Sequence, residues 1–141
     1  MAYPQRLHVM EVQQMLAACP THTTLPALDL ERARRFYAEK LGLTPETELP
    51  DVRDGLFYRC GGCRFLLYPS QGAANGAHTQ MTWTTNDIET EVAALKARGV
   101  VFEEYDTPGL KTVNSVATIG QSKGAWFNDS EGNLLALGQF D

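Results

Sequence analysis

His22 and the segment Cys60-Gly61-Gly62-Cys63 are the first candidates for chemistry in this sequence. An imidazole titrates near neutral pH, so His22 is a candidate general acid or base. No second catalytic group is evident from the sequence to act with it. The sequence also shows no Ser/His/Asp order, no phosphate-binding glycine loop and no paired-carboxylate motif.

The two thiols of Cys60 and Cys63 have the spacing of half a zinc knuckle. The other half is missing, because Cys19 is the only other cysteine and no histidine pair has ligand spacing. A redox pair would need a helix N-terminus to lower a thiol pKa, and none is expected here. We therefore interpret both cysteines as structural residues.

The elements that position these residues are organised around the stretch from His22 to Leu43. Leu25 and Ala27 alternate with more polar neighbours, which predicts a half-buried strand. Asp29 is placed to cap the helix that follows, and Gly42 to end it in the left-handed conformation that glycine adopts easily.

The same pattern returns from His78 to Val101, with a threonine-rich strand, a capping Asp87 and a closing Gly99. The two capping aspartates lie 58 positions apart and the two closing glycines 57 apart. Similarity at a fixed period indicates two copies of one supersecondary unit.

Two hairpins are predicted, one in each copy. Gly55 to Cys60 and Cys63 to Pro69 are joined by a Gly-Gly turn, which suits the positive φ angles of a two-residue loop. This turn pairs Cys60 with Cys63, Tyr58 with Phe65 and Phe57 with Leu66. In the second copy, strands are expected at Val100 to Tyr105, Val116 to Ile119, Ala125 to Asn128 and Leu134 to Gln139.

With an irregular or edge strand from Pro45 to Asp54, the first copy contains a strand, a helix and three further strands, and the second repeats this order with Val116 to Ile119 as a short strand within its loop. Two βαβββ repeats predict an α+β fold: a curved, eight-stranded mixed sheet with both helices outside. We assign residues 1–20 to an N-terminal helical extension that ends at Pro20, and residues 21–141 to one domain, with repeat one at 21–70 and repeat two at 77–141.

Composition narrows the function classes. The net charge of −5 argues against a nucleic acid partner, because tracking phosphates requires a basic excess. No apolar run reaches the roughly 20 residues that span a bilayer, so no membrane association is expected. Three cysteines make no disulfide framework, and the N-terminus lacks a secretory pattern, which indicates a cytoplasmic protein.

Two runs of residues resemble the vicinal oxygen chelate superfamily of glyoxalases, bleomycin resistance proteins and extradiol dioxygenases. One is the strand followed by Asp-Leu-Glu-Arg-Ala-x-x-Phe-Tyr-x-x-x-Leu-Gly-Leu from Asp29 to Leu43. The other is the segment from Trp126 to Asn133, which matches the aromatic-rich strand and Asp-Pro-x-Gly-Asn turn of the family. The resemblance covers about residues 21–140 and implies a curved sheet with a ligand site on its inner side.

The resemblance also implies where a metal would bind. Metal-using members take ligands, His or Gln with two Glu, from the first and last strands of each repeat, and the matching positions here are His22, Leu66, Gln80 and Ala136. One imidazole and one neutral amide are too few donors for a catalytic divalent ion. We therefore expect no metal and no cofactor.

The inward residues still describe a small-molecule pocket, with apolar and aromatic walls and a few polar groups. Trp126 is expected on its wall, Trp83 on the helix side, and Tyr105 at the rim.

We expect a metal-independent protein that binds a partly apolar or aromatic ligand. A metal-independent isomerase, lyase or cyclase acting on a carbonyl-bearing molecule, with His22 as its catalytic residue, remains the alternative. A homodimer is also expected, since the N-terminal helix needs a covering surface. The predicted ligand-binding residues are His22, Thr24, Phe57, Leu66, Tyr68, Gln80, Thr82, Trp126, Leu134 and Ala136.

Overall fold

The computed structural model describes residues 16–48 and 55–140. The first repeat contains β1 (Thr23–Ala27), α2 (Leu30–Leu41), β2 (Thr47–Glu48), β3 (Leu56–Cys60) and β4 (Cys63–Pro69). The second repeat contains β5 (Thr79–Thr84), α3 (Ile88–Ala97), β6 (Asp106–Thr107), β7 (Leu110–Val113), β8 (Val116–Ile119), β9 (Ser122–Asn128) and β10 (Leu134–Gln139).

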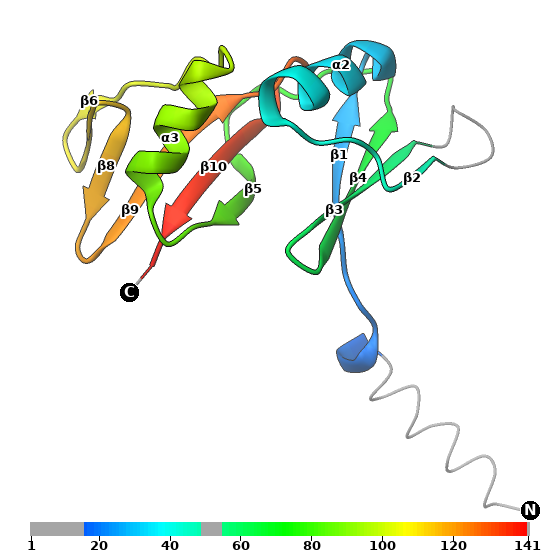
Figure 1. Cartoon of the computed structure of the whole chain (residues 1–141), viewed down its shortest axis with the longest axis horizontal. Helices are drawn as coiled ribbons and strands as arrows, with labels where there is room; N and C mark the ends of the chain where they lie inside the picture. Colours follow the sequence, from blue (N-terminus) through cyan, green and yellow to red (C-terminus); the bar gives the residue numbers. More distant parts are fainter. Residues whose placement is uncertain (1–15, 49–54, 141) are drawn as a thin grey trace, which may run out of the picture.

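The strands form two neighbouring sheets, and the fold class predicted from the sequence is confirmed (Figure 1). The first repeat gives a four-stranded sheet in the order β1-β4-β3-β2, and the second a six-stranded sheet in the order β5-β10-β9-β8-β7-β6. Each sheet is mixed, because its first strand runs parallel to its last and the other pairs are antiparallel. The second sheet exceeds the first by two strands because β6 and β7 form an added hairpin.

One predicted strand is wrong. Residues Val100 to Tyr105 do not form a strand; Phe102 alone makes an isolated bridge to Phe127. The apolar pattern there reflects two buried side chains, Val100 and Phe102, that close the core below α3, while Val101 between them is exposed. Alternating burial usually accompanies the backbone pairing of a strand. Here the side chains alternate between buried and exposed, but the backbone does not pair as a strand.

Both helices begin and end as the repeat predicts. The Asp29 carboxylate accepts the Arg32 N–H at 3.0 Å, and the Asp87 carboxylate accepts the Thr90 N–H at 3.3 Å. Gly42 ends α2 with φ at 70°. Because Asp29 and Asp87 occupy equivalent positions in the two repeats, the connection from β1 to α2 and the connection from β5 to α3 end in the same kind of helix cap.

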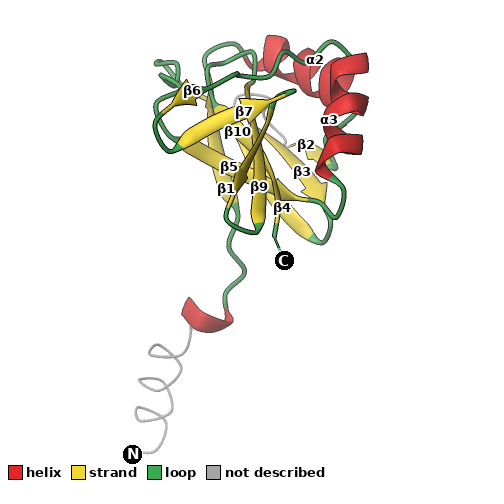
Figure 2. Ribbon diagram, turned by 90° about the vertical axis from the view of Figure 1, so that its left-hand side faces the viewer, coloured by secondary structure: helices red, strands yellow, loops and turns green. Residues whose placement is uncertain are grey.

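The helices cover one side of both sheets. Figure 2 shows α2 and α3 together on one side of the strands. The other side has no helix over it among the described residues, and we call it the open face. None of the described helices has the length and apolar character needed to cross a membrane. The core under the helices contains Leu25, Ala27, Tyr37, Tyr58, Phe65, Leu67, Ile88, Val92, Phe102, Ala125, Phe127, Leu135 and Leu137.

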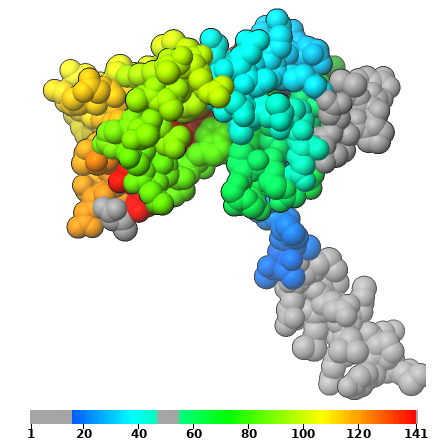
Figure 3. Space-filling view, in the orientation of Figure 1, coloured from blue at the N-terminus to red at the C-terminus, as the bar shows by residue number. Residues whose placement is uncertain are grey.

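The two repeats share this core. The Phe65 ring meets the Trp83 ring edge-on at 6.1 Å, and Trp83 stacks beside Phe127 at 6.3 Å. Beside this contact the surface is hollowed between α3 and the β3–β4 hairpin (Figure 3). The repeats are thus joined through the apolar layer between helices and sheets.

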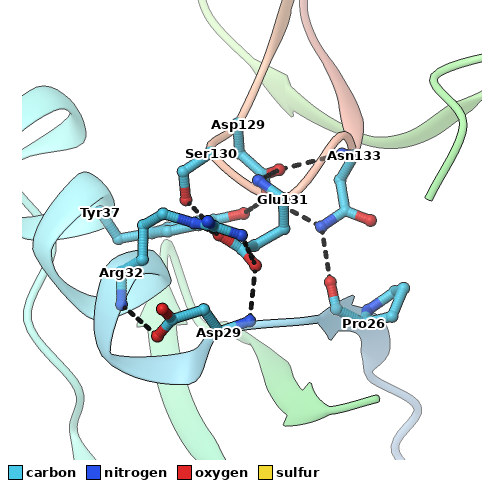
Figure 4. Close-up of polar contacts among 8 residues, drawn as sticks. All are labelled: Pro26, Asp29, Arg32, Tyr37, Asp129, Ser130, Glu131 and Asn133. Atoms are coloured by element: carbon cyan, nitrogen blue, oxygen red, sulfur yellow. Dashed lines mark hydrogen bonds and ion pairs between the residues drawn. The ribbon is translucent and has the colours of Figure 1, made fainter. Parts of the chain in front are cut away.

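A polar network also joins them, where the β9–β10 turn of the second repeat meets the start of α2 (Figure 4). The Glu131 carboxylate accepts the Asp29 N–H at 2.8 Å and two guanidinium N–H groups of Arg32 at 2.8 and 3.0 Å. The Tyr37 hydroxyl donates to Asp129 at 2.7 Å. The turn therefore completes the N-terminus of a helix that belongs to the other repeat.

Two predicted segments fall mainly outside the described residues. Of the N-terminal extension 1–20, only residues 16–20 are described, and residues 16–18 form a helical turn away from the sheets (Figure 1). Of the irregular strand predicted from Pro45 to Asp54, β2 is described, and residues 49–54 lie outside.

Candidate functional site

Three of the predicted site residues form one row across the first sheet. Thr24 pairs with Leu66 in the parallel β1–β4 ladder, and Leu66 pairs with Phe57 across the β3–β4 hairpin. Residues directly opposite in neighbouring strands project to the same side of a sheet. Because Leu25 and Leu67, one position along, are fully buried beneath α2, the row projects from the open face.

A second row crosses the other sheet. Thr82 pairs with Ala136 in the β5–β10 ladder, and Ala136 pairs with Trp126 across the last hairpin. The alternate residues Trp83, Leu137 and Ala125 face the helices. Trp126 and Trp83 therefore lie on opposite sides of one sheet.

The other predicted residues lie around these rows. His22 precedes β1, is exposed, and meets the Phe57 ring edge-on at 5.3 Å. Tyr68 is 36% exposed next to Pro26 in the register, and Leu134 is nearly buried. Gln80 sits at a β-bulge where the β5–β10 register shifts, and it borders a small hollow of about 320 Å³ with His78.

Each sheet therefore gathers its own group of predicted residues on the open face. Within the described residues, no hydrogen bond, ion pair or ring contact joins the group on the first sheet to the group on the second. The structure gathers the ten residues in two groups, one on each sheet, and the single pocket expected from the sequence stays a prediction.

An aromatic platform on the second sheet was missed. Gly124 and Gly138 lie directly opposite each other in the last hairpin. A Cβ atom on Gly124 would lie 2.8 Å from the Trp126 ring, and one on Gly138 would lie 2.6 Å from the Phe140 ring. The two rings therefore lie over bare backbone. The signal in the sequence is a glycine two residues before an aromatic residue, once in each strand.

Further aromatic contacts extend this surface. The Tyr105 ring meets Trp126 edge-on at 5.6 Å, and Phe140 remains 62% exposed. Burial, together with the nearby Glu103 carboxylate, raises the pKa of Tyr105, so its hydroxyl keeps its proton well above neutral pH. On the first sheet, the Arg64 guanidinium lies 4.0 Å over the Phe57 ring.

The residues present do not fit a metal ion. The positions that the resemblance assigns to metal ligands carry hydrocarbon side chains at Leu66 and Ala136. Among the described residues, no three His, Cys, Asp or Glu side chains gather closely enough to hold one. The open face is therefore built as an aromatic and apolar surface with polar groups at its edges.

The fold and the open face define a class of protein in which two βαβββ repeats present one side of their sheets to a small molecule. A family profile described as Glyoxalase/Bleomycin resistance protein/Dioxygenase superfamily matches residues 20–137. The chain belongs to that superfamily. No functionally curated protein matches the chain.

Solved structures share the fold. UcmS2 superposes with a TM-score of 0.68 at 19% identity, covering 86% of this chain and 97% of that protein. A glyoxalase/bleomycin resistance protein/dioxygenase from Alicyclobacillus acidocaldarius has a TM-score of 0.65 at 21% identity, covering 87% and 92%. TnmS3, an antibiotic binding protein from Streptomyces sp. CB03234, has a TM-score of 0.58 at 23% identity, covering 88% and 98%.

Proposed function

We propose that this chain is a metal-independent small-molecule-binding protein that holds a partly apolar or aromatic ligand against its open face. The observation that carries the proposal is the aromatic platform of Trp126 and Phe140 over paired glycines. Such a surface offers a flat ligand a large contact area without rearrangement of the backbone. The antibiotic binding protein TnmS3, which has the same fold, is in keeping with this class of function.

The polar groups around the platform suit a ligand with hydrogen-bonding substituents. Thr82 lies in the same row as Trp126, Gln80 precedes it on β5, and the Tyr105 ring contacts Trp126. Apolar walls with a few polar groups are the usual composition of small-molecule sites. The ligand class that fits is a planar molecule with oxygen or nitrogen substituents at its edge.

A second copy of the chain is proposed to cover the open face and complete the pocket. Phe140 on this face is 62% exposed, and Leu16 in the N-terminal segment is 84% exposed. Apolar surface of this kind is more stable when a partner covers it.

The three cysteines are free thiols, and we place the protein in the cytoplasm, where thiols stay reduced.

A thermal-shift screen of planar metabolites and antibiotics identifies the ligand, because a ligand at 100 times its dissociation constant adds about 2.7 kcal/mol to stability. The hit should quench Trp126 fluorescence in a Trp83→Phe variant. Trp126→Ala should weaken its binding by about 1 kcal/mol or more, roughly fivefold, if the ligand stacks on the ring.

Thr118→Ala is the control, since Thr118 is exposed and pairs with Lys123 rather than with a platform residue. Its affinity should equal that of the wild type. A hit whose affinity is the same in Trp126→Ala, in a protein that stays folded, would show that the ligand binds elsewhere. An unfolded Trp126→Ala protein would show that Trp126 is a core residue, and the ligand affinity of Trp126→Phe would then be compared with that of the wild type by thermal shift.

A further inference from the structure

A second cavity lies on the helix side of the sheets, where the repeats meet. It has a volume of about 390 Å³ and opens between α3 and the β3–β4 hairpin (Figure 3). We call it the inter-repeat cleft. It is a different space from the open face, because Trp83 and Leu137 on its wall point away from Trp126 and Ala136. Its lining consists of Leu41, Leu43, Arg59, Cys60, Trp83, Thr84, Thr85, Glu91, Leu95, Phe127 and Leu137.

The floor of the cleft is aromatic and rigid. The Trp83 and Phe127 rings are 6.3 Å apart with only 9° between their planes. Phe127 is fully buried and Leu137 nearly so, and both belong to the shared core. Trp83 is only half-buried, so part of the largest ring in the cleft is accessible. A preformed apolar floor of this size is typical of a small-molecule site.

Two charged side chains line the rim of the cleft, Arg59 and Glu91. The Arg59 guanidinium is paired with the Glu46 carboxylate at 2.7 Å, so its charge is already compensated. The Glu91 carboxylate, from α3, makes no hydrogen bond or ion pair with any described residue. A cation in the cleft would gain the attraction of Glu91 without displacing an existing partner.

From this floor and this rim, we propose that the inter-repeat cleft is a second small-molecule site, which takes planar aromatic cations. The ring of the ligand packs on Trp83 and its positive charge lies toward Glu91. Thr85 also lines the cleft, and its hydroxyl, which accepts the Asp87 N–H at 3.1 Å, still has its own proton to donate to a polar substituent. This site is independent of the open-face site and does not require the proposed function to be correct.

The chain contains two tryptophans, one on each side of the second sheet, so fluorescence can report the two sites separately. In Trp126→Phe, only Trp83 emits. Proflavine, a planar tricyclic cation at neutral pH, should quench it saturably. Anthracene-2-carboxylate, a planar tricyclic anion, should bind more weakly. Glu91→Gln should weaken proflavine binding by about two- to fivefold, as expected for one exposed charge pair.

Glu89→Gln is the matched control, because Glu89 lies on the same helix but pairs with Lys123 at 2.8 Å outside the cleft. It should leave proflavine affinity unchanged. A readout in the wild-type chain avoids the tryptophan variants: proflavine should slow iodoacetamide alkylation of Cys60, which lines the cleft, more than that of the exposed Cys63.

Three results would overturn the proposal. One is proflavine quenching Trp126 in Trp83→Phe while leaving Trp83 in Trp126→Phe unaffected. Another is equal affinity for the cation and the anion, unchanged by Glu91→Gln. The third is a Trp83 signal that varies with protein concentration and not with proflavine, which would make the cleft a contact between copies of the chain.

Discussion

At the scale of single residues, Glu131 shows how a buried carboxylate is kept ionised. Its side chain is 0% exposed, while its partner Arg32 is 46% exposed. Burial alone would raise the pKa of Glu131, but hydrogen bonds from the Arg32 guanidinium, the Asp29 N–H and the Ser130 hydroxyl outweigh it, and the pKa is lowered. Every oxygen of the group is therefore paired.

Glu131→Gln should destabilise the protein by about 1.5–3 kcal/mol at pH 7, the usual value for hydrogen bonds to a charged group. Because the folded-state pKa is below the unfolded one, the contribution of Glu131 is complete above about pH 4.5 and is lost as the pH falls through the folded value. Urea unfolding at several pH values measures this. The difference between wild type and variant should shrink in acid.

Glu46→Gln is the control for this prediction, because the Glu46–Arg59 pair is half-exposed. It should cost less than about 1 kcal/mol. A Glu131→Gln cost equally small and independent of pH would mean that the network does not hold the repeats together.

The residues on the open face also predict the metal content. Leu66 and Ala136 provide no donor atoms, so purified protein should contain no stoichiometric transition metal. Elemental analysis after purification without chelators measures this. About one nickel, zinc, iron or manganese ion per chain, lost in His22→Ala, would contradict the prediction.

At the scale of elements, two turns with similar backbone differ in their surroundings. Gly62 has φ of 86° and Gly132 has φ of 85°. A Cβ atom on Gly62 would meet nothing within 4 Å, whereas one on Gly132 would collide with the Ala74 carbonyl oxygen of the inter-repeat linker. The first turn only reverses the chain, and the second also packs against another segment.

Gly62→Ala should therefore cost about 1–2 kcal/mol, the strain of a left-handed residue alone. Gly132→Ala should cost clearly more, because the linker backbone must also shift. Thermal unfolding of the two variants compares them directly. Equal midpoints would show that the linker yields easily at Ala74.

The sequence predicts best those elements that are determined by residues close together in the chain. The Gly61-Gly62 turn fixed the register Cys60–Cys63, Tyr58–Phe65 and Phe57–Leu66, which the structure confirms. The β6–β7 hairpin was not predicted, because its turn residues Pro108 and Gly109 lack flanking runs of alternating apolar residues. The contact between Glu131 and α2 had no local signal, since its partners are separated by 102 positions.

At the scale of the whole molecule, the sequence predicted the two repeats but not the spaces between them. The spacing of Asp29 and Asp87 depends on the chain alone. The inter-repeat cleft depends on how Phe65 meets Trp83, which is a tertiary contact between side chains from different sheets. The alternation of residues along β5 predicts Trp83 on the helix side, but it does not indicate that a cavity forms beside the ring.

The assembly prediction belongs to this scale. The uncovered open face and the exposed Leu16 predict a homodimer at micromolar concentration. Light scattering coupled to size exclusion should give about twice the 15.6 kDa of one chain. A deletion of residues 1–20 tests the role of the extension, and a full-length chain that remains at monomer mass would end the prediction.

The cap that Glu131 supplies to α2 has a consequence for biosynthesis. Ribosomes add about 5–20 residues per second, so the codon for Glu131 is read roughly 5–20 s after that for Asp29, its partner 102 positions earlier. For most of this interval the Asp29 N–H and the Arg32 guanidinium of the nascent α2 lack Glu131, and the Tyr37 hydroxyl lacks Asp129. A premature stop codon that removes only the last hairpin would therefore deprive α2, near the start of the chain, of its contacts with the β9–β10 turn.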